Sequence, residues 1–140
     1  TANAFTADSW FRTGDVGYID GDGYLFITGR LKSVIVLENG KNVFPEEIEE
    51  YLASIEEIAE CVVVGRKAEN SDTINLVAVC YPNFDLIGEK DPAVVAPLLE
   101  SKIAALNKKL VGYKRIHSVE VRSEEFEKTT TRKIRRNLVK

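Results

Sequence analysis

Residues 35–49 read IVLENGKNVFPEEIE, and this stretch decides the fold of the 140-residue chain. Its first half places Asn39-Gly40 between two apolar runs, at residues 33–37 and 42–44. Asn-Gly between such runs is a strong short-range signal for a β-hairpin, because both residues accept the positive φ angles of a tight turn. A hairpin with the turn Glu38-Asn39-Gly40-Lys41 is therefore predicted.

The second half of the stretch predicts a helix that follows the hairpin directly. Pro45 suits the first helical position, and Glu46 and Glu47 favour the positive end of the helix dipole. The apolar residues that follow have the spacing of one buried helical face. They are Ile48, Tyr51, Leu52 and Ile55.

An earlier hairpin is predicted from Val16–Ile19 and Tyr24–Thr28, which flank the turn Asp20-Gly21-Asp22-Gly23. The turn is similar to a calcium-binding loop. With Gly23 in the glycine position of such a loop, however, the first and twelfth positions hold a tyrosine and a glycine, which supply no carboxylate. No metal site is predicted.

The residues after the helix predict a small α+β domain. Two runs rich in β-branched residues, Glu60–Gly65 and Thr73–Tyr81, suit central strands. A long helix is predicted from Asp91-Pro92 to Gly112, and a short strand at Ile116–Val121. This order favours an α+β fold in which helices cover one small sheet, with an N-terminal β-hairpin. The buried face of the long helix would comprise Val95, Leu99, Ile103, Leu106 and Leu110.

The C-terminal segment from Glu124 to Lys140 differs from the rest. It has little apolar periodicity beyond Phe126, Ile134 and Leu138, and every charged residue in the range 128–140 is basic. Such a segment has weak means of packing itself, so a basic tail that is mobile or held by a partner is predicted. Its charge favours an anionic partner.

Composition narrows the class of protein. The chain has 44% hydrophobic and 29% charged residues and a net charge of −3, as expected of a soluble globular protein. Its apolar runs are strand-sized, so no transmembrane segment and no secretory signal are predicted.

Cys61 and Cys80 are interpreted as reduced core thiols, with a disulfide between neighbouring strands as the alternative. The single histidine, His117, is interpreted as structural, and the absence of methionine indicates a segment of a longer protein.

Three further motifs surround the hairpin and helix. Phe11-Arg12-Thr13-Gly14-Asp15 and Gly29-Arg30-Leu31-Lys32 precede them, and the basic phrase Thr129–Arg136 follows near the end. In this order the motifs resemble the AMP-forming adenylating enzymes, which include acyl-CoA synthetases, peptide-synthetase adenylation domains and luciferases. The resemblance implies a large N-terminal domain joined by a hinge to a small mobile C-terminal domain. Residues 1–30 would be the end of the large domain, and residues 31–140 the small domain.

The resemblance also implies a role for each early motif. Asp15 would hold the ribose hydroxyls of ATP or AMP, since an ionised carboxylate accepts hydrogen bonds from adjacent hydroxyl groups. Arg30 would contact the ribose or its neighbours, and Lys32 would be the hinge whose backbone torsions change between two half-reactions. The turn Asn39-Gly40-Lys41 would line the pantetheine passage for CoA, where a glycine permits close approach.

By the same resemblance, Lys133 would be the catalytic lysine of the adenylation step. It would bridge the substrate carboxylate and the α-phosphate of ATP, and removal of such a preorganised charge typically costs about 10² to 10³ in rate. Many members of the family have glycine immediately before this lysine, whereas this chain has Arg132.

The implied function is that of a fragment of an ATP-dependent fatty acid–CoA ligase, in the cytoplasm or at the periphery of a membrane. Such an enzyme converts a fatty acid and ATP to acyl-AMP and then forms a thioester with CoA. The sequence contains no glycine-rich phosphate-binding loop, so most of the ATP site, the Mg²⁺ site and the acyl pocket are expected in a missing N-terminal domain. The fragment alone is expected to be inactive, and no nucleic-acid partner is expected. Two alternatives stay open: an adenylation domain that loads a carrier protein, and a stand-alone module whose basic tail binds RNA or another anion.

Overall fold

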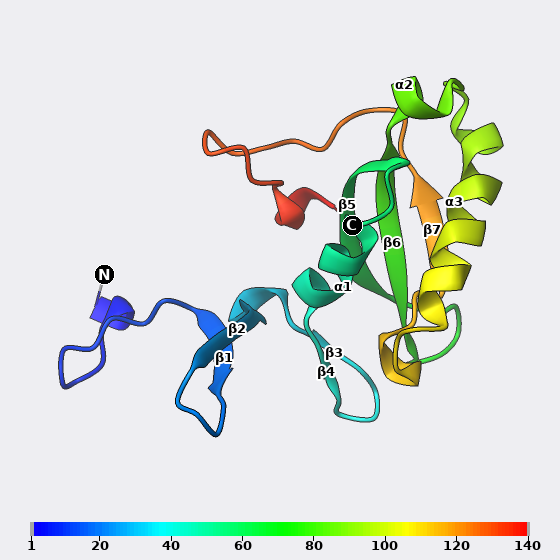
Figure 1. Ribbon diagram of the computed structural model, residues 1–140. Helices are drawn as coiled ribbons and strands as arrows, with labels where there is room; N and C mark the ends of the chain where they lie inside the picture. The colour runs from blue at the N-terminus through cyan, green and yellow to red at the C-terminus, as the bar shows by residue number, and fades with distance from the viewer. Residues whose placement is uncertain (1, 140) are drawn as a thin grey trace.

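The computed structural model describes residues 2–139 and is shown in Figure 1. Its strands are β1 (Asp15–Ile19), β2 (Leu25–Arg30), β3 (Ile35–Val36), β4 (Asn42–Val43), β5 (Ile58–Lys67), β6 (Ile74–Pro82) and β7 (Ser118–Val121). Its α-helices are α1 (Pro45–Leu52), α2 (Phe84–Ile87) and α3 (Pro92–Asn107). Short 3₁₀ turns are η1 (Ala2–Ala4), η2 (Leu31–Ser33), η3 (Gly112–Lys114) and η4 (Arg136–Leu138).

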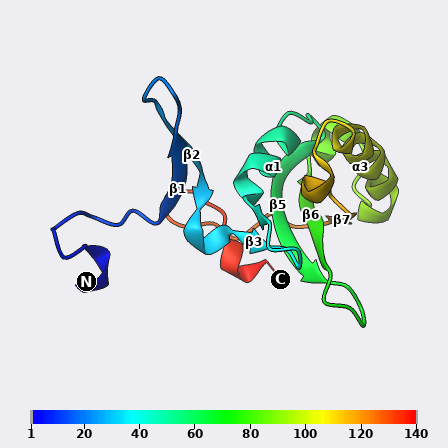
Figure 2. The same cartoon turned by 90° about the horizontal axis from the view of Figure 1, so that it is seen from below.

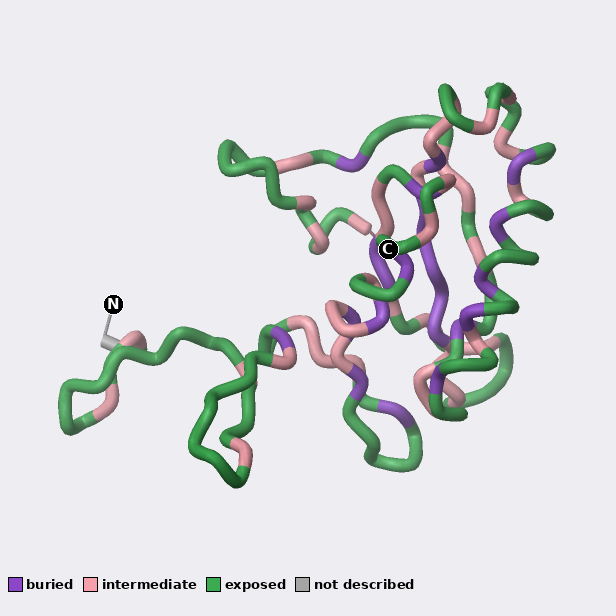
Figure 3. Tube along the Cα trace, in the orientation of Figure 1, coloured by how far each residue is buried: buried purple, intermediate pink, exposed green. Residues whose placement is uncertain are grey.

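Both predicted hairpins are present. Strands β1 and β2 pair antiparallel with Asp15 opposite Arg30, and β3 pairs with β4 with Ile35 opposite Val43. Figure 1 shows the β1–β2 hairpin standing apart from the larger body of the chain. Most of its large apolar side chains are exposed. Figure 3 accordingly colours most of the hairpin green, for exposed residues. The hairpin therefore contributes little to the core of the chain.

The body is built on a three-stranded sheet in the order β5-β6-β7, in which β5–β6 is antiparallel and β6–β7 is parallel. Helices α1 and α3 cover one face of this sheet (Figure 2). The buried side chains between them come from alternate positions of the strands and from the apolar faces of the helices, which is the pattern expected of a sheet covered on that face. The predicted α+β class is confirmed. The fully buried members include Val43, Ile48, Leu52, Ala78, Cys80 and Leu99.

The C-terminal segment covers the other face of the sheet. Phe126 is only 4% exposed and packs with Val62, Val77 and Val79, whose side chains face away from the helices. Ile134 and Val139 pack against the same cluster. The segment thus has more means of packing than its sequence pattern indicates, since a few apolar side chains meet a ready-made apolar face. Its mobility stays a prediction.

Two details of the predicted helices are wrong. The long helix α3 ends at Asn107, before Gly112. There the Asn107 side chain bonds the backbone of Ile116: its Nδ2 donates to Ile116 O at 2.8 Å, and Ile116 N donates to its Oδ1 at 2.9 Å.

Tyr51 is 54% exposed and does not belong to the buried face of α1. That face is centred on Pro45, Ile48 and Leu52, and Tyr51 lies about a quarter-turn away from it.

Two smaller features complete the fold. His117 is exposed and lies just before β7 rather than within it, with its backbone N–H donating to Leu76 O at 2.8 Å. The one-turn helix α2, whose N-cap Asn83 accepts a bond from Leu86 N at 3.3 Å, was not predicted. Within residues 2–139, no helix has the length and apolar character needed to cross a membrane.

Candidate functional site

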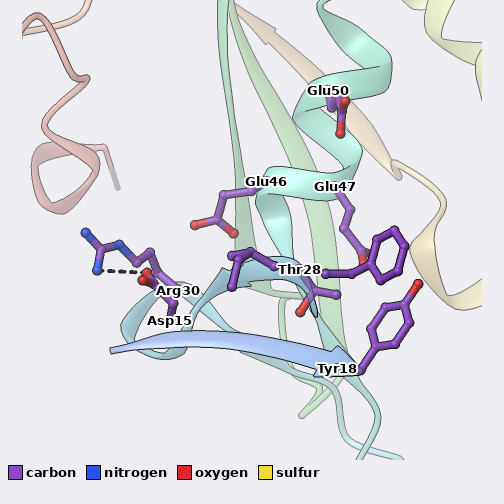
Figure 4. Close-up of a pocket in the computed structure, with 10 residues that line it drawn as sticks. Asp15, Tyr18, Thr28, Arg30, Glu46, Glu47 and Glu50 are labelled. Atoms are coloured by element: carbon purple, nitrogen blue, oxygen red, sulfur yellow. Dashed lines mark ion pairs between the residues drawn. The ribbon is translucent and has the colours of Figure 1, made fainter. Parts of the chain in front are cut away.

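Asp15 and Arg30 form an ion pair at the base of the N-terminal hairpin. Arg30 Nη1 lies 2.9 Å from Asp15 Oδ1 and also donates to Thr13 O at 2.9 Å (Figure 4). The pair follows from the register of the hairpin, which sets the first residue of β1 opposite the last residue of β2. The Asp15 side chain is 32% exposed and its contact with Arg30 is through Oδ1, so the carboxylate is accessible to a diol such as ribose that would donate hydrogen bonds to it. The structure therefore brings the two predicted ribose-binding residues together.

A cleft of about 470 Å³ lies between this hairpin and helix α1. Glu46 and Glu47 project from the start of α1 toward the hairpin, which contributes Tyr18 and Thr28 (Figure 4). Within the described residues, Oε2 of Glu46 is buried without a hydrogen-bond partner. It lies where a side chain on Gly29 would be, since a Cβ at Gly29 would be 2.9 Å from it. Gly29 is thus required for the close approach of α1 to the hairpin.

Arg30 and Lys133 line a second cleft, of about 460 Å³. Glu46, Glu49 and Arg136 also line it. Lys133 is exposed, whereas Glu49 and Arg136 are half-buried. The residues come from the end of β2, from α1 and from the C-terminal segment, which are far apart in the sequence. The structure therefore places the predicted catalytic lysine on the same cleft as one of the two predicted ribose-binding residues.

The backbone before Lys133 forms a tight turn. Thr129 N donates to Lys133 O at 2.8 Å and Arg132 N donates to Thr129 O at 2.9 Å. Lys133 N also donates to Thr129 Oγ1 at 3.2 Å. Arg132 has φ of 61°, in the left-handed region that favours glycine. The turn therefore keeps a glycine-type geometry although arginine occupies the position.

The predicted hinge residue, Lys32, is exposed and lies in η2, directly after β2. The predicted CoA-channel residues Asn39, Gly40 and Lys41 form the tip of the β3–β4 hairpin. Lys41 N donates to Asn39 Oδ1 at 3.0 Å, and Lys41 Nζ lies 4.5 Å from the ring centroid of Tyr113. Figure 1 shows this tip and the orange tail at opposite ends of the molecule. The structure therefore does not bring the hairpin tip together with Lys133.

The two cysteines are neighbours across β5 and β6, where Cys61 is opposite Cys80, and both are free thiols. Burial raises the pKa of Cys80 to about 12. The pKa of Cys61 is raised as well, mainly by burial and to a smaller extent by Cys80 and Glu49 beside it. Both are therefore neutral at pH 7 and unsuited to act as nucleophiles. Among residues 2–139, no group of three His, Cys, Asp or Glu side chains is arranged to hold a metal ion.

Two residues of the second cleft were missed by the reading of the sequence. Glu49 was one of several acidic residues in a helix, and Arg136 was one of several basic residues in the tail. They are 87 positions apart, yet they form a two-pronged ion pair. A single sequence holds no signal for such a pairing, because it depends on how the tail returns to the sheet.

The α+β fold, the acid–arginine pair at the end of β2 and the exposed lysine of the tail are the features expected of the C-terminal domain of an adenylate-forming enzyme. The chain belongs to the family of AMP-binding enzyme C-terminal domains, whose model matches residues 32–140. The resemblance noted in the sequence is confirmed at this level.

Known relatives with CoA-ligase activity match the chain. Indoleacetate–CoA ligase of Aromatoleum aromaticum is 45% identical over 102 residues, covering 72% of this chain and 19% of that protein. Long-chain-fatty-acid–CoA ligase FadD15 of Mycobacterium tuberculosis is 35% identical over 159 aligned positions, covering 99% of this chain and 26% of that protein. The solved structure of anthranilate–CoA ligase AuaEII in complex with anthranoyl-AMP has a TM-score of 0.75 and 29% identity, covering 92% of this chain and 23% of its own. The chain thus spans about a quarter or less of the length of these relatives.

Proposed function

We propose that this chain is the C-terminal part of an ATP-dependent acid–CoA ligase that works in two half-reactions. In the first, a carboxylate and ATP would form an acyl-adenylate; in the second, CoA would take the acyl group as a thioester. Residues 1–30 would belong to the large domain and residues 31–140 to the small domain, with Lys32 as the hinge. The observation that carries the proposal is the cleft on which Arg30, paired with Asp15, and Lys133 lie together.

The geometry supports a division of labour between the two ends of the small domain. Lys133 lies on the side of Arg30, where its ammonium group would meet the substrate carboxylate and the α-phosphate and oppose the charge that develops during attack. The tip of the β3–β4 hairpin, with Gly40, lies at the other end and would face the reaction centre only after rotation about Lys32. ATP, Mg²⁺ and CoA would be bound mainly by the large domain.

The acid substrate is proposed to be a fatty acid. The match to the mycobacterial long-chain-fatty-acid–CoA ligase runs over nearly the whole chain, and this supports the proposal. Other relatives are named for indoleacetate and 2-succinylbenzoate, so the family itself accepts acids of different kinds. The two free thiols fit a cytoplasmic enzyme, because the cytosol keeps thiols reduced.

Lys133→Ala in the full-length enzyme tests the proposal. Adenylation, followed as fatty-acid-dependent exchange of pyrophosphate with ATP, should fall by about 10² to 10³. Thioester formation from CoA and a supplied acyl-adenylate should be preserved. An equal loss of both half-reactions would contradict the role of Lys133, and acylation of a carrier protein in place of CoA would favour the other type of adenylating enzyme.

The ion pairs that basic residues of the tail form with the body of the domain disfavour an RNA-binding module. Lys128 is held by Glu60 and Glu125, and Arg136 is held by Glu49. These ion pairs use part of the positive charge that nucleic-acid binding would need.

A further inference from the structure

A two-pronged ion pair of Glu49 and Arg136 ties the tail to the body of the domain. Arg136 Nη1 donates to Glu49 Oε1 and Nη2 donates to Glu49 Oε2, each at 2.7 Å. The two side chains are only 16% and 29% exposed. A two-pronged arginine–carboxylate pair fixes orientation as well as distance, and partial burial limits its screening by salt.

The pair also occupies the free edge of the sheet. β5 is an edge strand, so half of its backbone groups have no neighbouring strand to bond. Val63 N donates to Glu49 Oε1 at 2.7 Å, and Arg136 Nη1 donates to Val63 O at 3.4 Å. The pair is therefore anchored to the sheet itself, and both partners are held in place by the backbone of β5.

Arg136 comes three residues after Lys133, and the segment before Lys133 is held as well. Lys128 pairs with Glu60 of β5, and its backbone forms a bridge to Ile134. Arg135 N donates to Glu127 O at 2.7 Å, which closes the base of the loop. The turn that carries Lys133 is thus fixed on both sides, and Arg136 fixes the side that lines the cleft with Arg30.

We propose that Glu49 and Arg136 form a clamp that positions Lys133 for the adenylation step. They are positioning residues: they act through the tail and need not touch the substrates. The inference rests on the proposed function, because it assumes that Lys133 acts in adenylation. Without the clamp, the turn at residues 129–133 would keep its own hydrogen bonds and the Lys128–Glu60 pair, but it would lose its anchor on the side that lines the cleft with Arg30. A misplacement of about 1 Å can cost about 10²-fold in rate.

The test uses the full-length enzyme with Glu49→Gln, Arg136→Met and Arg136→Lys. Glu49→Gln keeps an oxygen for Val63 N–H while removing the charge, so it disturbs the sheet edge little. The matched control is Glu57→Gln, which removes the charge from the Glu57–Lys102 pair, a 2.8 Å contact that involves no residue of the tail. For each variant, kcat and KM are measured in both half-reactions, together with Tm and hydrogen exchange of residues 129–136.

Glu49→Gln and Arg136→Met should lower kcat of adenylation by about 10- to 100-fold. Thioester formation from a supplied acyl-adenylate should stay within about twofold, and amide protection of residues 129–136 should fall. Arg136→Lys should lie between wild type and Arg136→Met, because lysine offers one prong of the contact. The double variant should be no worse than the poorer single variant, since both changes break the same contact.

Two outcomes overturn the clamp. One is normal adenylation in Glu49→Gln and Arg136→Met when Lys133→Ala is inactive in that step; the proposed function then stands and only the clamp fails. The other is an equal loss of both half-reactions with a lowered Tm, which shows a general structural role. If Lys133→Ala itself retains full adenylation, the proposed function fails, and the clamp fails with it.

Discussion

Arg132 occupies the position in the tail turn that Gly40 occupies in the β3–β4 turn. Arg132 N donates to Thr129 O and Gly40 N donates to Leu37 O, each at 2.9 Å, and the two φ angles are 61° and 77°. The same backbone geometry is thus built once with glycine and once with arginine. For a residue with a Cβ, the left-handed conformation costs about 1–2 kcal/mol.

Arg132→Gly should therefore stabilise the chain slightly. The relief of the strained φ is partly offset by the greater freedom of glycine in the unfolded state, about 0.5–1 kcal/mol, so a net gain of up to about 1 kcal/mol is expected. The free energy of unfolding, measured with urea, checks this. Arg132→Ala retains the Cβ and should give no gain; a gain equal to that of the glycine variant would contradict the explanation by strain.

Gly40→Ala should slow thioester formation while leaving adenylation nearly unchanged. Among residues 2–139, no atom beyond the two chain neighbours lies within 4 Å of a Cβ at Gly40, so the effect on folding comes from the φ of 77° alone. Gly23, in the turn of the other hairpin, is the matched control, because it has φ of 89° and equally open surroundings. After the same offset from the unfolded state, both alanine variants should lose up to about 1 kcal/mol of stability. Only Gly40→Ala should lower the rate of CoA thioester formation, and an equal effect of Gly23→Ala would remove the special role of the β3–β4 tip.

Gly29→Ala should destabilise the contact between the N-terminal hairpin and α1. The new Cβ would lie 2.9 Å from Glu46 Oε2 and 3.2 Å from Phe44 Cδ1, and overpacking of this kind costs about 1–3 kcal/mol. Glu46→Ala in the same chain should restore part of the loss, because it removes the nearer of the two atoms. Equilibrium unfolding of both variants measures the effect. If Glu46→Ala restores no stability, the loss in Gly29→Ala does not come from steric overlap with Glu46.

Local signals predicted most of the fold. Asn39-Gly40 and Pro45 specify a turn and a helix start through their own backbone preferences, and the structure confirms both. Tyr51 was assigned wrongly, because the spacing of apolar residues does not show that α1 ends at Leu52 and buries a narrower face. The order of the motifs was readable from the chain, and it led to the correct family.

The shared cleft of Arg30 and Lys133 could not be predicted in the same way. It depends on the return of the tail across the sheet, which Phe126 and the Glu49–Arg136 pair secure. Each of these residues finds partners in β5, β6 or α1, far away in the sequence. Only the packed structure shows which of several acidic and basic residues pair, because their separate sequence environments are alike.

The thiols of Cys61 and Cys80 should make the domain sensitive to alkaline pH. Burial raises both pKa values, that of Cys80 to about 12, whereas an unfolded cysteine has a pKa of about 8.5. A raised pKa in the folded state means that the stabilising effect is fully present below about pH 8.5 and is lost as the pH rises toward 12. In that window the free energy of unfolding should fall by up to about 1.4 kcal/mol per pH unit for each thiol. Urea unfolding between pH 8 and 11 measures the slope, and Cys80→Ala should reduce it. At pH 8 the buried thiol of Cys80 should react with a disulfide reagent such as dithionitrobenzoate only as fast as the chain opens; rapid reaction of Cys80 in a native Cys61→Ala chain would refute its burial.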